Sequence, residues 1–205
     1  MIRALTRTAV AAAALAALGG CSLLSSPEPV RLYRFGAAPT AEVGASGAPA
    51  GQVAVAMGRP EFAQAARDDR ILGVTGTDAA YIAGARWVAS ADVLFSDALE
   101  DAFAAGAQRV RLIGPRELTR SSQTLDVDVR TFEARYPAPE TAPTVTIVAR
   151  VRLLDSRERT VAAERIFAVE EPAAANRVGA IVEAFDAATR NLNGQIVAWT
   201  DQNAR

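Results

Sequence analysis

The fold is decided by residues 123–170, which run QTLDVDVRTF at 123–132, TVTIVARVRLL at 144–154 and TVAAERIFAV at 160–169. In the first piece aliphatic residues alternate with charged ones, and in the second, Val145, Ile147 and Val151 share one face. Such alternation is typical of a strand with one buried and one solvated face. A tight turn at 155–158 separates the second piece from the third. The stretch therefore predicts an antiparallel meander of three strands.

Two helices are predicted outside the meander, over residues 90–106 and 176–200. In each of them apolar residues recur at three- and four-residue spacing, as Phe95, Leu99 and Phe103 do in the first. The predicted fold class is α+β: a mainly antiparallel sheet with two helices packed on one face, preceded by a signal peptide. Shorter strands are expected at 30–35, 52–57, 70–74, 80–88 and 109–113.

The first 20 residues have the pattern of a secretory signal peptide. Arg3 and Arg7 precede an apolar run at 9–18, which is shorter than the roughly 20 residues that a spanning helix needs. The run ends in Leu18-Gly19-Gly20-Cys21, which resembles the lipobox of bacterial lipoproteins, and Cys21 is the only cysteine. The alternative is an ordinary signal peptide with an incidental cysteine. We predict a lipoprotein signal peptide at 1–20, a lipidated tether at 21–29 that begins with acylated Cys21, and one domain at 30–205.

Acylation of Cys21 would anchor the protein to a membrane without a spanning helix. Each buried CH₂ of an acyl chain contributes about 0.8 kcal/mol, and two or more chains hold a protein stably at the bilayer. Ser22 follows the cysteine, where an Asp usually marks retention at the inner membrane. We therefore expect the protein on the periplasmic face of the outer membrane.

The composition argues against most enzymes. The chain of 205 residues has no histidine, one cysteine and a net charge of −1, and all 22 basic residues are arginine. It therefore lacks the usual general base, the commonest metal ligand and the lysine of Schiff-base chemistry. It also lacks the basic field that holds nucleic acid. We predict no catalytic activity, no metal and no cofactor, and we disfavour an envelope hydrolase that would use Ser with acidic residues.

Tyr81, Arg86 and Trp87 form the strongest candidate for a partner-binding site. They lie within seven positions, and Tyr, Arg and Trp are the residue types most enriched at interface hot spots. The functional interpretation is a docking patch on the surface. The alternative is a core tryptophan with its arginine neighbour at the rim of the sheet.

Several weaker candidates each have a structural alternative. Asp68-Asp69 could serve acid–base chemistry, but Arg67 and Arg70 flank them and favour a salt-bridged loop. Asp126 and Asp128 share one strand face and could bind a metal, although solvated alternation explains them. The remaining candidates for partner contact are Tyr33 with Phe35, the loop at 36–51, and Trp199, which could instead pack under its helix.

An ordered set of short motifs spans nearly all the mature chain: the lipobox, Tyr33, Gly58-Arg59-Pro60, Asp69-Arg70-Ile71, Tyr81, Ala85-Arg86-Trp87, Leu94, Leu99-Glu100, Phe132-Glu133, Phe167, Ala184-Phe185, Ala188 and Trp199. In this order they resemble the ABC-type transport auxiliary lipoprotein component family, whose members are also called PqiC-like lipoproteins. No single motif is specific, but the ordered set is.

The resemblance implies a non-catalytic lipoprotein that accompanies an ABC transporter. In such systems a periplasmic subunit carries a mammalian-cell-entry domain, and lipids or other hydrophobic compounds move between the two membranes. The implied partners are the membrane, reached through the lipid anchor, and the mammalian-cell-entry subunit; association between copies of this chain stays open. The alternative is a periplasmic carrier that itself encloses an acyl chain, for which an apolar cavity between sheet and helices would be needed.

Overall fold

The computed structural model describes residues 29–36, 51–114, 117 and 120–205. The predicted signal peptide, Cys21 and most of the predicted 36–51 loop lie outside these residues. The chain divides into two compact units, Met1–Val30 and Arg31–Arg205, and every described element belongs to the second. The elements are β1 (Arg31–Tyr33), β2 (Val53–Met57), β3 (Glu61–Phe62), α2 (Gln64–Arg67), β4 (Arg70–Thr75), β5 (Asp78–Trp87), α3 (Ala91–Gly106), β6 (Val110–Ile113), β7 (Gln123–Tyr136), β8 (Thr144–Asp155), β9 (Thr160–Pro172) and α4 (Val178–Asn203).

The predicted meander is confirmed as strands β7, β8 and β9. Twelve residue pairs join β7 to β8 and twelve join β8 to β9, all antiparallel. A bulge in β7 leaves Arg130 unpaired between Val129 and Thr131. Because side chains alternate with a period of two, this extra residue moves the buried positions from odd to even numbers. Val129 is buried before the bulge, and Phe132 and Ala134 are buried after it.

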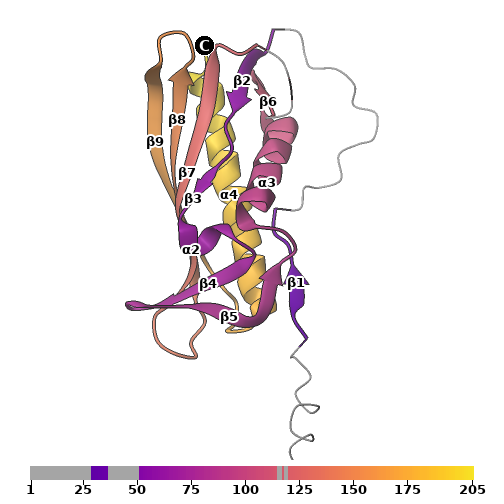
Figure 1. Ribbon diagram of the computed structural model, residues 1–205, viewed down its shortest axis with the longest axis vertical. Coiled ribbons are helices and arrows are strands. Elements are labelled where there is room, and N and C mark those ends of the chain that lie inside the picture. The colour runs from indigo at the N-terminus through magenta and orange to yellow at the C-terminus, as the bar shows by residue number, and fades with distance from the viewer. Residues whose placement is uncertain (1–28, 37–50, 115–116, 118–119) are drawn as a thin grey trace, which may run out of the picture. The chain divides into compact units, whose positions relative to one another are not determined.

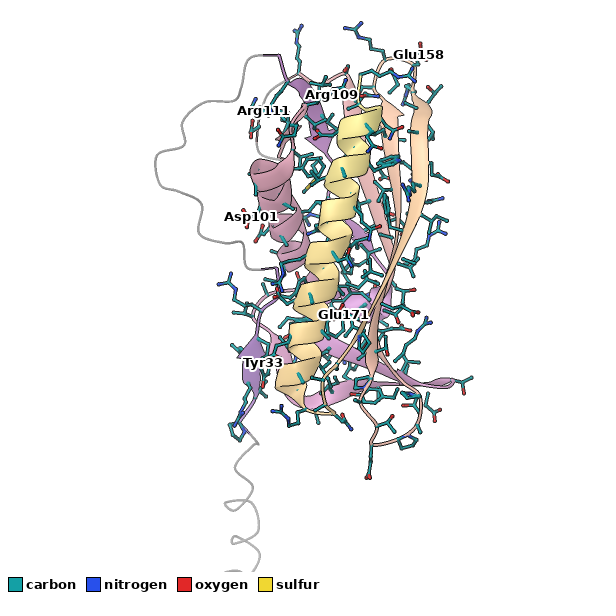
Figure 2. All side chains as sticks on the ribbon, turned by 180° about the vertical axis from the view of Figure 1, so that it is seen from behind. Tyr33, Asp101, Arg109, Arg111, Glu158 and Glu171 are labelled. Carbon is teal, nitrogen blue, oxygen red and sulfur yellow. The ribbon has the colours of Figure 1, made fainter. Side chains whose placement is uncertain are left out.

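The two predicted helices lie on the same face of the sheet, which confirms the α+β class (Figures 1 and 2). Helix α4 packs on β8 and β9 and against α3. Phe185, Leu192 and Ile196 of its apolar stripe are completely buried. Trp199 packs edge-on against Phe167 of β9, with ring centroids 6.1 Å apart, so the interpretation of Trp199 as a residue packed under its helix is correct.

Five short pairings in the described part of the sheet are parallel, and the sequence pattern did not predict them. Strands β2, β3 and β4 follow one another along β7, each parallel to it. In addition β1 runs parallel to β5, and β2 to β6. The longest pairings are nevertheless antiparallel, so most paired residues belong to antiparallel ladders. Strand β3 and helix α2 are too short to produce a periodic pattern, which is why the sequence did not reveal them.

The turn between β8 and β9 contains a carboxylate that holds two backbone amides. Asp155 accepts hydrogen bonds from the N–H groups of Glu158 at 2.9 Å and Arg157 at 2.8 Å. These bonds favour the charged carboxylate and lower the pKa of Asp155 from its ordinary 3.8. Figure 2 shows Glu158 at the end of the domain opposite Tyr33 of β1.

We expect this turn to lose stabilisation in acid. Because the folded-state pKa of Asp155 is lower than the unfolded value, its contribution is complete above the unfolded pKa and is lost as the pH falls through the folded pKa. A ¹³C NMR titration of the Asp155 side-chain carboxyl should give a midpoint below 3.8. A midpoint at or above the ordinary value would contradict the hydrogen bonds seen here.

Candidate functional site

The three residues of the predicted docking patch lie on β5 but not on one surface. Trp87 is 2% exposed, whereas Tyr81 is 37% exposed and the Arg86 side chain is 45% exposed. Successive residues of a strand point to opposite faces, so Arg86 and Trp87 cannot both face a partner. The assignment of Trp87 to a docking surface is therefore corrected: its side chain belongs to the core. Partner binding through Tyr81 and Arg86 stays a prediction.

Trp87 joins an aromatic cluster between the sheet and the helices. Its ring meets Phe35 edge-on at a centroid distance of 4.8 Å and Phe185 at 5.3 Å. Phe132 of β7 lies 4.8 Å from Phe185 and 5.2 Å from Phe35. Phe35 is thus a core residue too, and Tyr33 is half-buried against the same core. These side chains fill the space between the sheet and the helices at this end of the core.

Tyr81 is covered on one side by an arginine from the neighbouring strand. The guanidinium carbon of Arg70 lies 3.7 Å from the centroid of the Tyr81 ring, a cation–π contact. Because β4 and β5 are antiparallel, Leu72 lies directly opposite Tyr81. The pair is exposed, and no acidic side chain among the described residues forms an ion pair with Arg70.

Asp68 and Asp69 do not act together. Both carboxylate oxygens of Asp69 accept hydrogen bonds from Arg86 Nη1, each at 2.9 Å. The Asp68 carboxylate instead lies 3.9 Å from Arg67 Nε. The salt-bridged interpretation is therefore correct for both, although the partner of Asp69 is Arg86 and not Arg70. All of these side chains are about half exposed, so each pair contributes little to stability.

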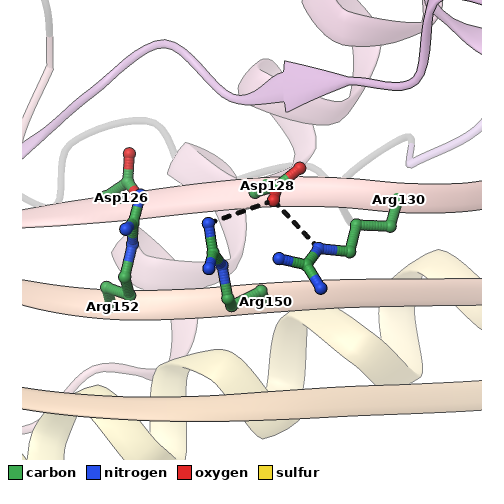
Figure 3. A network of polar contacts seen from close by, with 5 residues as sticks. All are labelled: Asp126, Asp128, Arg130, Arg150 and Arg152. Atoms are coloured by element: carbon green, nitrogen blue, oxygen red, sulfur yellow. Dashed lines mark hydrogen bonds and ion pairs between the residues drawn. The ribbon is translucent and has the colours of Figure 1, made fainter.

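Asp126 and Asp128 belong to a network of ion pairs on the face of the meander opposite α4 (Figure 3). Asp126 lies 2.7 Å from Arg152 Nη2 on β8. Asp128 lies 3.0 Å from Arg130 Nε and 3.5 Å from Arg150 Nη2. The hydrogen bond and the charge of Asp126 raise the pKa of Arg152. Both carboxylates are therefore engaged in ion pairs with arginine side chains.

The described hollows are not enclosed apolar cavities. One of about 580 Å³ is lined by Arg59, Glu61, Arg67, Asp68 and Asp92, among others, and a neighbouring one of the same size shares Arg59 and Asp92. A third, of about 450 Å³, is an open groove between the C-terminal halves of α3 and α4. The first two are lined largely by charged side chains, and the third is open to solvent.

One contact near the end of α4, made by Asp201, has no local signal in the sequence. Asp201 of α4 accepts hydrogen bonds from the backbone N–H groups of Gln108 at 2.7 Å, Arg109 at 3.1 Å and Val110 at 2.9 Å. Gln108 and Arg109 lie in the connection between α3 and β6, and Val110 is the first residue of β6. Their sequence separation from Asp201 exceeds 90 residues, so no local motif could have revealed the contact.

In the part of the chain that the structure describes, no three His, Cys, Asp or Glu side chains are placed to hold a metal ion. None of the described helices is long and apolar enough to cross a membrane. The fold and its surface define an α+β domain whose acidic candidate residues are engaged in ion pairs with arginine.

The chain belongs to the ABC-type transport auxiliary lipoprotein component family, whose model matches residues 33–197. This confirms the resemblance seen in the sequence. The family is an auxiliary component of ABC transporters and is associated with the cell envelope. No curated protein matches the chain.

Solved structures support the same assignment. Protein XCC0632 from Xanthomonas campestris, described as a member of the DUF330 family, is 28% identical with a TM-score of 0.68 over 84% of this chain and 96% of its own. The hypothetical protein CT253 from Chlamydia trachomatis is 14% identical with a TM-score of 0.52 over 74% of this chain and 97% of its own. The first is a member of the same family, and the second shares the fold.

Proposed function

We propose that this protein is a non-catalytic, lipid-anchored subunit of an ABC transporter that moves lipids or other hydrophobic compounds across the cell envelope. It would be held by Cys21 on the periplasmic face of the outer membrane, with residues 30–205 as its folded domain. Its direct partner would be the periplasmic mammalian-cell-entry subunit. Membership of the transport auxiliary family is the observation that carries this proposal.

The side chains support a role in assembly over one in chemistry. The carboxylates with catalytic potential, Asp68, Asp69, Asp126 and Asp128, are each paired with arginine. Histidine and lysine are absent from the sequence, and its one cysteine is the predicted lipidation site. The aromatic cluster around Trp87 favours a scaffold over a carrier that encloses its own lipid.

The proposal is tested by isolating the protein with its partners. Affinity-tagged full-length protein, crosslinked in cells and purified from the envelope, should enrich a mammalian-cell-entry subunit together with its permease and ATPase. A tagged outer-membrane lipoprotein of another family serves as the control. Recovery of no transporter subunit above this control would contradict the proposed partner.

The anchor is tested separately by replacing Cys21. Cys21→Ala should accumulate as an uncleaved precursor that takes up no labelled fatty acid, because the thiol that forms the thioether is gone. Ser22→Ala, which leaves the thiol in place, should be labelled like the wild type. Normal labelling of Cys21→Ala would contradict lipidation at this residue.

A further inference from the structure

Strand β5 leaves one end of the described sheet open. Its residues 78–81 pair with β4 on one side, and only its far end, residues 85–87, pairs with β1 on the other. Leu72 of β4 lies opposite Tyr81, and Arg70 lies opposite Arg86. Between these two pairs, one residue of β4 is matched by four residues of β5. Gly84, at φ +67°, lies in this bulge and separates the open segment from the segment that β1 covers. Residues 78–81 are all exposed.

The open segment directs backbone groups outward. Strands β4 and β5 join through the two-residue turn Gly76-Thr77, with Gly76 at φ +58°. In such a hairpin the residues that flank the turn exchange hydrogen bonds, and the next pair along does not. Thr75 and Asp78 flank the turn, so Ala79 and Tyr81 direct their N–H and C=O groups away from β4. These are the groups to which another strand could bond.

The two long edges of the sheet differ in how they are protected. Strand β9 carries Glu164, Arg165, Glu170 and Glu171, and it ends at Pro172. Charges and proline are the usual means by which proteins keep an edge from pairing. The β5 segment reads Ala-Ala-Tyr-Ile-Ala-Gly from 79 to 84, with its one acidic residue, Asp78, beside the turn. The β5 edge therefore lacks the protection that β9 has.

The sequence before β1 is unsuited to extending the β1 pairing along this edge. Tyr33 accepts a hydrogen bond from the Val88 N–H, so in this parallel pairing the odd-numbered residues of β1 direct their N–H groups at β5. Continuing the pairing backwards would require an N–H at position 29 and another at position 27. Both positions are proline, which has none.

Charge indicates what the edge would accept. Arg70 lies over Tyr81 with the ring as its partner and with no acidic side chain paired to it in the described structure. An incoming strand with an acidic side chain next to Tyr81 would form an ion pair with Arg70. The small side chains Ala79 and Ala80 leave room for a second backbone to approach.

We propose that the open edge of β5, residues 78–81, binds an extended segment of the transporter's periplasmic subunit by strand addition, with an acidic side chain of that segment pairing with Arg70. The partner's identity rests on the proposed function, whereas strand addition rests on the edge itself. Backbone hydrogen bonds supply the binding energy in this mode, and side chains such as Arg70 select the segment.

The test uses the full-length lipoprotein in cells, with the photocrosslinker benzoylphenylalanine at Tyr81 or, as a comparison, at Val161 on the β9 edge. We expect a light-dependent product with the transporter subunit from position 81 and much less from position 161. Ala79→Pro should reduce the product at least tenfold, because it removes an outward N–H and leaves the bonds to β4. Ala162→Pro is the matched control, because Ala162 is the unpaired bulge residue of β9.

The charged contact has a test of its own. Arg70→Glu should reduce the crosslink from position 81 at least tenfold, with a melting temperature close to that of the wild type. If Ala79→Pro does not fold, Arg70→Glu still decides the question.

Four outcomes separate the possibilities. A product with another protein that depends on Ala79 and Arg70 would support strand addition and overturn the proposed partner. A product with copies of this chain alone, or with lipid alone, would overturn the inference. So would a folded Ala79→Pro, or an Arg70→Glu, that crosslinks like the wild type. Recovery of the transporter subunit by affinity, with no product at position 81, would place the interface elsewhere and leave the proposed function standing.

Discussion

Replacing Trp87 by alanine should lower the free energy of unfolding by about 3–5 kcal/mol, the usual cost of removing a large aromatic side chain from a core. Trp87 is 2% exposed and its ring contacts Phe35, Phe132 and Phe185. These neighbours come from separate elements, β7 and α4 among them. The cavity left by the indole could not close without moving the sheet relative to the helix.

The neighbouring residue provides a matched control. Val88 is 54% exposed, and Val88→Ala should change the stability by less than about 0.5 kcal/mol. Urea unfolding of the domain without its signal segment, followed by circular dichroism, measures both variants. A loss below about 1 kcal/mol for Trp87→Ala would show that the indole is not packed as described and would reopen its role at an interface.

Replacing Asp201 by alanine should cost about 2–3 kcal/mol, because three backbone N–H groups lose a charged acceptor at once. The carboxylate holds the amides of Gln108, Arg109 and Val110, and Arg109 also donates to the Asp201 backbone carbonyl at 3.2 Å. The loss should be local as well as global. Hydrogen exchange at Gln108 and Val110 should accelerate more than exchange in the meander.

Asp101 is the control for charge alone. It is an exposed acid on α3, and Figure 2 shows it away from Arg109 and the end of α4. Asp101→Ala should alter the free energy of unfolding by less than about 0.5 kcal/mol. Equal effects of the two substitutions would mean that the carboxylate of Asp201 acts through net charge and not through its three hydrogen bonds.

The predicted docking patch shows where a local pattern stops being informative. Tyr81, Arg86 and Trp87 are close in sequence, and residue type alone suggested a common surface. The strand alternation at Arg86 and Trp87 was visible in the sequence and already implied that only one of them could face outward. What decided between them was the aromatic cluster, which draws Phe35, Phe132 and Phe185 from distant positions to the Trp87 side of β5.

The bulge at Arg130 shows a similar limit. The alternation from Leu125 to Val129 predicted a strand, and that strand is present. The same alternation, continued without a break, would have turned Phe132 toward solvent. The bulge returns Phe132 to the core, where it touches Phe35, Phe62, Trp87 and Phe185. The strand was predictable, but its local irregularity depended on what the core required.

The sequence by itself determined the long elements and most of their buried faces: the meander of β7, β8 and β9, and helices α3 and α4. It also contained the motif order that places the chain in its family. The buried face of a strand or helix can be predicted from the local sequence, because side chains return to the same face every two residues in a strand and every 3.6 in a helix. Only the tertiary structure decided that β2, β3 and β4 run parallel along β7, that Asp201 holds the start of β6, and that β5 keeps an open edge. Backbone hydrogen-bonding groups are the same in nearly every residue, so their partners are chosen by the packing of the whole domain.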